Sequence, residues 1–276
     1  MQLAGFIKYM RRNKSEETIK GYICSLNKFK AYLGNNKGTR ANVDAYVQHL
    51  IDTNNSPASV HRHYWAVKSY FNYLGIGETI KGIQLPKLML SDAKSATKDE
   101  IESLLNYEHL TARESLMIVL TYTLGLRVGE LLRIKIEHYD PEVHSIRITS
   151  EKKRSGALTD TMHLEKKAWT DLESYIKTLT FTNGFLFSPD GVKAISPDTV
   201  RNHLAQLCRA IGIRYLNPHS FRHGRGTDLA ISGASKEQIR QYLRQRSDKT
   251  ASRYIHMKGM DLKDKIPPAF ITEEKT

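Results

Sequence analysis

The chain has 276 residues, 40% hydrophobic and 26% charged, which is typical of a globular protein with one large domain or two smaller ones. Its 42 Lys and Arg against 29 Asp and Glu give a formal net charge of +13, which favours a polyanionic partner such as nucleic acid or an anionic membrane surface. The sequence contains neither an apolar run long enough to span a bilayer nor the features of a signal peptide. We therefore expect an intracellular, cytoplasmic protein with no membrane partner.

Residues 1–83 are predicted to form a helical domain. Apolar side chains recur at helical spacing in three segments, residues 3–10, 19–33 and 40–51. A fourth helix is predicted to begin with Ser56 as its N-cap and Pro57 at its first position, to carry Leu74 inward, and to end before Gly75. Cys24 and Cys208 both lie in helical apolar patterns and are expected to be buried, without a disulfide or a metal.

The fourth helix also carries a polar face between its apolar positions. Its members are His61, Arg62, His63 and Lys68. Such a face could meet the phosphates of a nucleic acid, although for any one of these residues an ordinary solvated surface is the more common reading.

Residues 84–96 show no clear period and contain Pro86, so they are predicted to be a linker, followed by a second domain over residues 97–276. Two capping-box patterns, at Thr97 and at Thr111, predict helix starts, and the second opens a strongly apolar helix expected to be buried. Two segments, residues 143–149 and 157–164, alternate in polarity around a basic connection and predict a β-hairpin. Helices are predicted to resume around residue 165, which makes the fold class mainly α with a small antiparallel β-sheet.

Two helical segments of the second domain carry candidates for chemistry. In TLGLRVGELL, residues 123–132, Arg127 falls in the tight turn between two predicted helices, where a guanidinium group could bind a phosphate with both arms. In HSFRH, residues 219–223, His219 and Arg222 share a helix face. The alternatives are an ordinary surface arginine for Arg127 and a metal pair formed by His219 and His223, for which no further ligand pattern follows.

Two further candidates lie at a hairpin tip and near the C-terminus. The tip carries Lys152, Lys153 and Arg154, which form either a solvated turn or a source of a lysine able to protonate a departing oxygen. The segment SDKTASRYIHM carries Tyr254, which in isolation would be read as a packing residue of an amphipathic helix.

Taken in order, these four patterns resemble the tyrosine recombinase (phage integrase) family over essentially the whole chain. The resemblance implies a helical DNA-clamping, core-binding domain at residues 1–83, a linker at 84–96 and a catalytic domain at 97–276. It also implies a site-specific recombinase that cleaves and rejoins double-stranded DNA through a covalent 3′-phosphotyrosine intermediate. Such enzymes act without a metal, ATP or another cofactor, and as tetramers on two duplexes, so we expect a homotetramer on DNA.

The resemblance assigns the catalytic set residue by residue. It consists of Arg127, Lys152 or alternatively Lys153, His219, Arg222, Gln245 and Tyr254, with Glu130 at an acidic position that supports the first arginine. The fifth position departs from the family, because Leu243-Arg244-Gln245 stands where Leu-Gly-His or Leu-Gly-Trp is common. A glutamine amide donates hydrogen bonds but neither titrates nor carries charge.

Two alternatives to an active recombinase follow from the same residues. A DNA-binding protein with a decayed catalytic site is compatible with Gln245. A monomeric enzyme of the topoisomerase IB type, which relaxes DNA, would use the same chemistry without exchanging strands.

Overall fold

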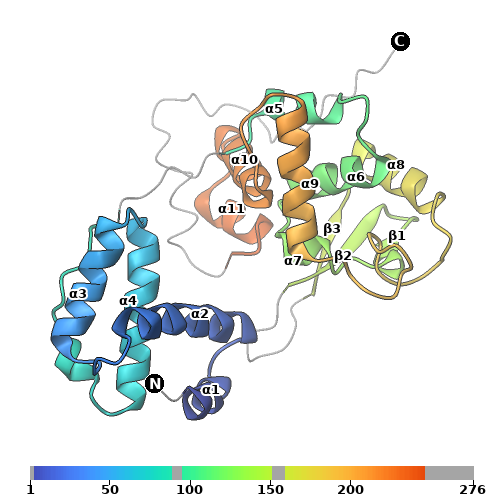
Figure 1. Ribbon diagram of the computed structural model, residues 1–276. Helices are drawn as coiled ribbons and strands as arrows, with labels where there is room; N and C mark the ends of the chain where they lie inside the picture. The colour runs from blue at the N-terminus through green and yellow to red at the C-terminus, as the bar shows by residue number, and fades with distance from the viewer. Residues whose placement is uncertain (1–2, 89–94, 151–158, 246–276) are drawn as a thin grey trace. The chain divides into compact units, whose positions relative to one another are not determined.

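The computed structural model describes residues 3–88, 95–150 and 159–245. The chain divides into two compact units, Met1–Asp92 and Ala93–Thr276, and the division falls inside the segment 84–96. Within the described residues the fold is mainly helical with one small antiparallel sheet, as the sequence predicts (Figure 1). No helix in these residues is both long and apolar enough to cross a membrane.

The N-terminal unit is a helical bundle. Its helices are α1 (Ala4–Arg11), α2 (Glu16–Leu33), α3 (Arg40–Asp52), α4 (Pro57–Tyr73) and the short 3₁₀ helix η1 (Gly77–Ile80). Side chains fix the starts, since the hydroxyls of Ser15, Thr39 and Ser56 accept the backbone N–H groups that begin α2, α3 and α4. The helices bury a common apolar core that includes Phe6, Leu26, Phe29, Val43, Val60, Val67 and Ile80.

Three predictions for this unit are wrong. His63 does not belong to the polar face of α4, because its ring is buried and its Nδ1 lies 2.9 Å from the Tyr46 hydroxyl. Leu74 is 47% exposed, because α4 has already ended at Tyr73. Cys24 is exposed on α2, whereas Cys208 in the second unit is buried as expected.

The second unit is built around helix α6 (Ala112–Thr123), whose residues from Leu116 to Thr123 are all buried. The other helices are α5 (Lys98–Leu105), α7 (Val128–Leu131), α8 (Lys166–Ile176), α9 (Pro197–Ala210), α10 (Pro218–Ile231) and α11 (Lys236–Tyr242), with the 3₁₀ helix η2 (Ile136–His138). Helices α5, α7, α8 and α10 all pack against α6, so it forms the centre of the unit (Figure 1). A helix surrounded in this way is apolar on every side, which explains why its sequence shows little amphipathic period.

The sheet has the strand order β1-β2-β3 and is antiparallel throughout. Strands β2 (Ser145–Thr149) and β3 (Thr159–His163) form the predicted hairpin, with Ile146 and Ile148 of β2 buried in the core. The first strand, β1 (Tyr139–Asp140), was not predicted, because two residues are too few to show an alternating pattern. The basic tip that joins β2 to β3, with Lys152 and Lys153, lies outside the described residues.

Candidate active site

The site begins at the turn that ends α6. After Thr123 the backbone N–H of Gly125 donates to the Tyr122 carbonyl at 3.1 Å and that of Leu126 to the Thr121 carbonyl at 3.0 Å, an arrangement that needs a left-handed residue at Gly125 (φ 57°). A side chain at Gly125 would also collide with Leu243. The turn therefore requires glycine, and the chain leaves it into α7, as the sequence predicts.

Arg127 is the N-cap residue of α7, and Glu130 is bound to it by two contacts. The Glu130 carboxylate accepts the backbone N–H of Arg127 at 2.9 Å and the Arg127 Nη1 at 2.6 Å. Ser150, the residue directly after β2, donates its hydroxyl to the same carboxylate at 3.3 Å. Glu130 is fully buried, whereas 38% of the Arg127 side chain is exposed, so the carboxylate holds an arginine that still faces solvent.

Arg222 reaches the same carboxylate from α10. That helix starts at the N-cap Asn217, whose side chain accepts the backbone N–H of His219 at 2.8 Å. One helical turn later Arg222 is buried, donates to the carbonyls of Gly125 and Leu243, and places its Nη1 3.8 Å from Glu130 Oε2. Residues far apart in the sequence thus converge at the C-terminal end of α6, where exposed carbonyls attract cations.

A third guanidinium group, which the sequence analysis did not assign, belongs to Arg244. Its Nη2 lies 3.4 Å from Glu130 Oε2 and donates to the carbonyls of Leu124 at 3.0 Å and Gly125 at 3.2 Å. The side chain is only 6% exposed. The sequence does contain a signal for it, because a long cationic side chain stands at the end of α11 where glycine was expected.

One carboxylate therefore faces three cations. Burial alone would raise the pKa of the Glu130 carboxyl, but the charges of Arg244, Arg127 and Arg222 and the N–H of Arg127 lower that pKa below its ordinary value. Glu130 is accordingly ionised at neutral pH, and arginine stays protonated even when buried. With one negative and three positive charges, the cluster has an excess of positive charge next to the half-exposed Arg127.

His219 is exposed and lies one turn before Arg222 on α10. The surrounding protein and the positive charges of Arg222 and Arg127 lower the pKa of its ring from the ordinary value of 6.5. The imidazole is therefore neutral at neutral pH and able to accept a proton.

The structure brings together Arg127, His219 and Arg222 of the residues expected from the sequence, and it places Gln245 directly after Arg244. The Gln245 side chain is buried and its amide oxygen has no hydrogen-bond partner in the described residues. Tyr254, like Lys152 and Lys153, lies outside the described residues.

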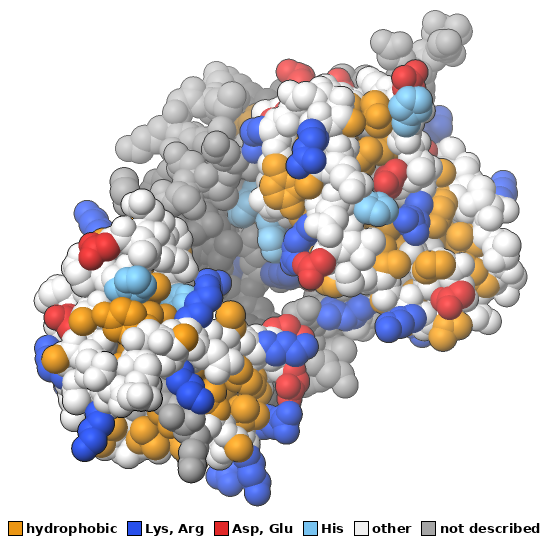
Figure 2. Space-filling model, in the orientation of Figure 1, with side chains coloured by type: hydrophobic (Ala, Val, Ile, Leu, Met, Phe, Trp, Pro, Cys, Tyr) orange, Lys and Arg blue, Asp and Glu red, His pale blue; other side chains and the backbone are white. Residues whose placement is uncertain are grey.

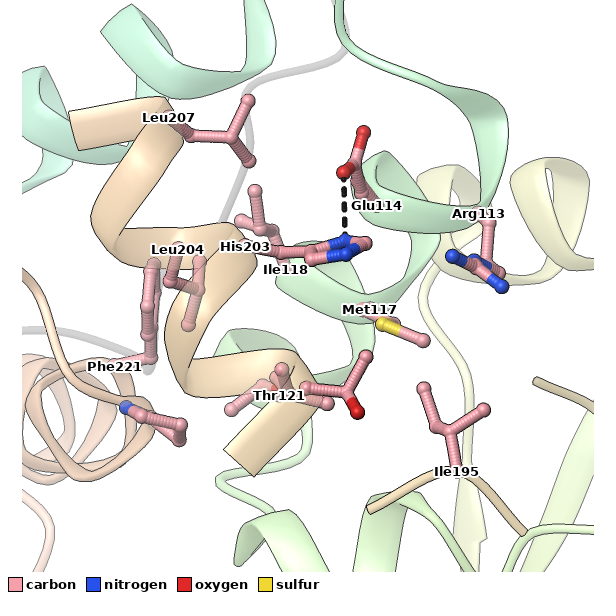
Figure 3. Close-up of a pocket in the computed structure, with 13 residues that line it drawn as sticks. Arg113, Glu114, Met117, Ile118, Thr121, Ile195, His203, Leu204, Leu207 and Phe221 are labelled. Carbon is pink, nitrogen blue, oxygen red and sulfur yellow. Dashed lines mark hydrogen bonds and ion pairs between the residues drawn. The ribbon is translucent and has the colours of Figure 1, made fainter. Parts of the chain in front are cut away.

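Two other features help to define the site by contrast. A mostly apolar pocket lies between α6 and α9, where the Nδ1 of His203 lies 3.2 Å from the Glu114 carboxylate (Figure 3). None of Arg127, Glu130 and Arg222 lines it. Within residues 3–88, 95–150 and 159–245, no three His, Cys, Asp or Glu side chains lie close enough together to hold a metal ion.

Positive charge is also present on the N-terminal unit. On the face drawn in Figure 2, Lys and Arg side chains of this unit are interspersed with hydrophobic ones. On α4, Arg62 is exposed and Lys68 places its Nζ 5.1 Å from the ring centroid of Trp65, which is 48% exposed. An exposed indole with a lysine at its ring, on a helix that also exposes an arginine, is a surface able to contact a polyanion.

Comparison with known proteins agrees with this geometry. The model of the phage integrase family matches residues 94–259, and that of the phage integrase N-terminal SAM-like domain matches residues 3–75. The tyrosine recombinase XerA of Pyrococcus furiosus is 27% identical over 98% of this chain and 94% of its own length. The tyrosine recombinase XerD of Listeria innocua is 24% identical over 92% of this chain and 93% of its own.

Solved structures show the same fold. A lambda integrase fragment, solved as a dimer bound to a COC′ core site, superposes with a TM-score of 0.72 at 19% identity, covering 96% of this chain and 97% of that one. The Tn1549 transposon integrase in complex with transposon right end DNA gives a TM-score of 0.71 at 16% identity, with 95% of this chain and 97% of that one covered. Since the two family models together match most of its residues, the chain belongs to the phage integrase family of tyrosine recombinases.

Proposed function

We propose that this chain is a site-specific recombinase that cleaves and rejoins duplex DNA by attack of Tyr254 on a backbone phosphate. The observation that carries the proposal is the convergence of Arg127 and Arg222 on Glu130, which leaves an excess of positive charge beside a solvent-facing guanidinium. Such a site suits a phosphate that gains negative charge in the transition state.

The two arginines bind the non-bridging oxygens of that phosphate. Fixed guanidinium groups stabilise the transition state more than the ground state, because charge gathers on those oxygens as the new bond forms. Arg127 is held by Glu130 and still faces solvent, so it needs little reorganisation. The buried Arg222 exchanges one of its bonds to the carbonyls of Gly125 and Leu243 for a phosphate oxygen. Gln245, at the fifth position, donates an N–H of its amide to the same phosphate.

Proton transfers complete the step. His219, neutral because its pKa is lowered, accepts the proton of the Tyr254 phenol, whose ordinary pKa near 10 makes it a weak nucleophile on its own. The phenolate oxygen bonds to phosphorus, and the bond to the 5′-oxygen breaks. Lys152, or in its place Lys153, protonates that leaving oxygen; Ser150, two residues before Lys152, already contacts Glu130.

The product is a 3′-phosphotyrosine and a free 5′-hydroxyl. The phosphotyrosine conserves the energy of the phosphodiester, so a 5′-hydroxyl of the same or another duplex reverses the step without ATP. The cations are supplied by arginine, and the proposal requires no metal. The N-terminal domain, residues 1–83, contacts the duplex through surfaces such as the exposed face of α4, and residues 97–276 carry the chemistry. We propose a homotetramer on two duplexes, acting in the cytoplasm.

The test uses duplexes that the protein selects by binding from a random-sequence library. Each selected duplex is then synthesised with a nick beside each candidate cleavage position, so that the short strand released by cleavage diffuses away and the covalent intermediate is trapped. Wild-type protein is expected to become covalently attached to the DNA. Tyr254→Phe, which removes only the nucleophilic oxygen, is expected to bind the same duplexes and to form no adduct, as resolved on denaturing gels.

The outcomes separate the alternatives. Binding by the wild-type protein without an adduct on any selected duplex would contradict the proposal and favour a decayed site. An adduct that relaxes supercoiled DNA but never exchanges strands between two labelled duplexes would favour an enzyme of the topoisomerase type. An adduct retained by Tyr254→Phe would show that another residue is the nucleophile.

A further inference from the structure

Arg244 occupies a backbone position that normally belongs to glycine. It follows α11, its φ is 50°, and its N–H and that of Gln245 donate to the carbonyls of Gln241 and Arg240, both at 2.9 Å. This is the helix ending in which a left-handed residue is required, and a side chain there is strained. A residue kept against such strain needs a compensating contact elsewhere.

The compensating contacts lie within the arginine cluster. The Arg244 guanidinium donates to the carbonyls of Leu124 and Gly125 and faces Glu130, while the Arg244 carbonyl accepts the Nη2 of Arg127 at 3.4 Å. Arg244 therefore bonds to the end of α6, to the carboxylate that holds Arg127, and to Arg127 itself. It does so from the segment that leads directly into Gln245.

The buried guanidinium does not reach the surface on which a phosphate would lie. Only 6% of the side chain is exposed, and both of its Nη atoms contact protein acceptors, which hold the guanidinium inside the protein. Its Nε is buried and has no partner in the described residues. Its influence on a phosphate is therefore indirect. Of the charges around the Glu130 carboxyl, that of Arg244 lowers the pKa most.

We propose that Arg244 is a positioning residue of the phosphate site, which locks Glu130 and the end of α6 to the end of α11 and thereby fixes Arg127, Arg222 and Gln245 in place. The inference rests on the proposed function in that the ligand is a phosphate of DNA. It adds an arginine at a left-handed backbone position that favours glycine, next to a fifth position that holds an uncharged amide. Its buried cation supplies positive charge that Gln245 lacks.

Arg244→Gly tests this cleanly, because glycine is the preferred residue for the left-handed backbone and relieves strain while it removes the guanidinium. We expect the rate of covalent attachment to selected nicked duplexes to fall roughly 10- to 100-fold, since small displacements of positioning groups cost that much, with DNA binding retained. Arg244→Lys keeps the charge without the planar fork and should recover part of the rate.

A matched control is available in the N-terminal unit. Asn54 is also a non-glycine residue with positive φ, 56°, and it is exposed. Asn54→Gly should leave the attachment rate unchanged, because it alters the same kind of backbone position without touching the cluster. An Arg244→Gly rate equal to those of the wild type and of Asn54→Gly would overturn the inference, as would an Arg244→Lys rate no better than that of Arg244→Gly.

A second readout does not depend on catalysis. Inorganic sulfate, a probe for the phosphate oxygens, should raise the melting temperature of the wild type more than chloride of equal ionic strength does. The amount by which Arg127→Ala reduces this rise in melting temperature measures the contribution of sulfate bound at the arginine cluster. Arg244→Gly should reduce the rise by most of the same amount. An unchanged sulfate effect in Arg244→Gly would contradict the inference. Loss of the sulfate effect, with no adduct from the wild type on any duplex, would instead support positioning by Arg244 and refute the proposed function.

Discussion

Two carboxylates in the second unit occupy the same local position and have different surroundings. Glu100 and Glu130 are each the third residue of a helix, and each accepts the N–H of its N-cap residue at 2.9 Å. Glu100 is matched by one cation, Arg214, whose Nε and Nη2 lie 2.6 and 2.8 Å from its two oxygens. Glu130 is faced by three.

The difference distinguishes a structural ion pair from the proposed phosphate site. In the Arg214–Glu100 pair one positive charge meets one negative charge, and the Nη2 of Arg214 also donates to the Ser95 carbonyl at 2.6 Å. Around Glu130 the positive charge exceeds the negative, and one of the arginines is exposed. An uncompensated cluster costs stability in the free protein and is retained when a ligand supplies the missing anion.

The largest expected effect comes from removing the exposed cation. Arg127→Ala should lower the rate of covalent attachment to DNA by about 100- to 1,000-fold, because it removes a donor to the charge that develops on the phosphate. Overall DNA binding, supplied by many phosphate contacts, should change little. Single-turnover cleavage and a binding titration measure the two quantities.

Arg214→Ala is the matched control for that change. It removes an arginine from a balanced pair, so it should lower thermal stability slightly and leave the cleavage rate as it is. A cleavage loss of the same size in both variants would show that the comparison between the two carboxylates has no functional meaning.

The next effect concerns pH. Because the pKa of His219 lies below 6.5, its ring is neutral above pH 6.5 and can accept a proton. Protonation of the ring should therefore not limit the cleavage rate above pH 6.5. Below that pH the rate should fall as the ring is protonated. His219→Gln should lower the rate by about 100-fold and abolish this decline. A decline that persists in His219→Gln would assign the acidic limb to another group.

The smallest expected effect is on stability. The pKa of Glu130 is lowered from its ordinary 4.5 in the folded protein, so its ion contacts stabilise the fold above that pH and the contribution disappears as the pH falls through the lowered value. Glu130→Gln should cost about 2 kcal/mol at neutral pH, with the difference from the wild type shrinking below pH 4.5. Denaturant unfolding at several pH values measures both.

Glu100→Gln provides the comparison. It removes a carboxylate that faces one cation, and part of the Arg214 side chain is exposed, so the expected cost is about 1 kcal/mol. A greater loss in Glu100→Gln than in Glu130→Gln would contradict the claim that the three-cation cluster depends on its single anion.

Local signals made most of the fold predictable from the sequence. The capping boxes at Thr97 and Thr111, the helix start at Ser56-Pro57 and the alternation around residues 143–149 each depend on only a few neighbouring residues. The place of Arg127 in the turn between two helices, and the helix face shared by His219 and Arg222, were predicted in the same way. These signals need no knowledge of what packs where.

The remaining features depend on partners distant in sequence. His63 is buried because Tyr46 of another helix bonds to it, and the two-residue strand β1 exists only because β2 pairs with it. The burial of Arg244 also depends on distant partners, since the carbonyls that it contacts at the end of α6 are more than a hundred residues away in the sequence. A charged residue at a helix end is ordinarily exposed, and no local pattern indicates that this one is buried against Glu130.

The most direct test is the structure of Tyr254→Phe bound to a selected duplex, because this variant keeps the site intact and stops before cleavage. The account predicts that the guanidinium groups of Arg127 and Arg222 contact non-bridging oxygens of one and the same phosphate, with the His219 ring beside it. If in every such complex the two arginines contact different phosphates, or no phosphate at all, the account is wrong.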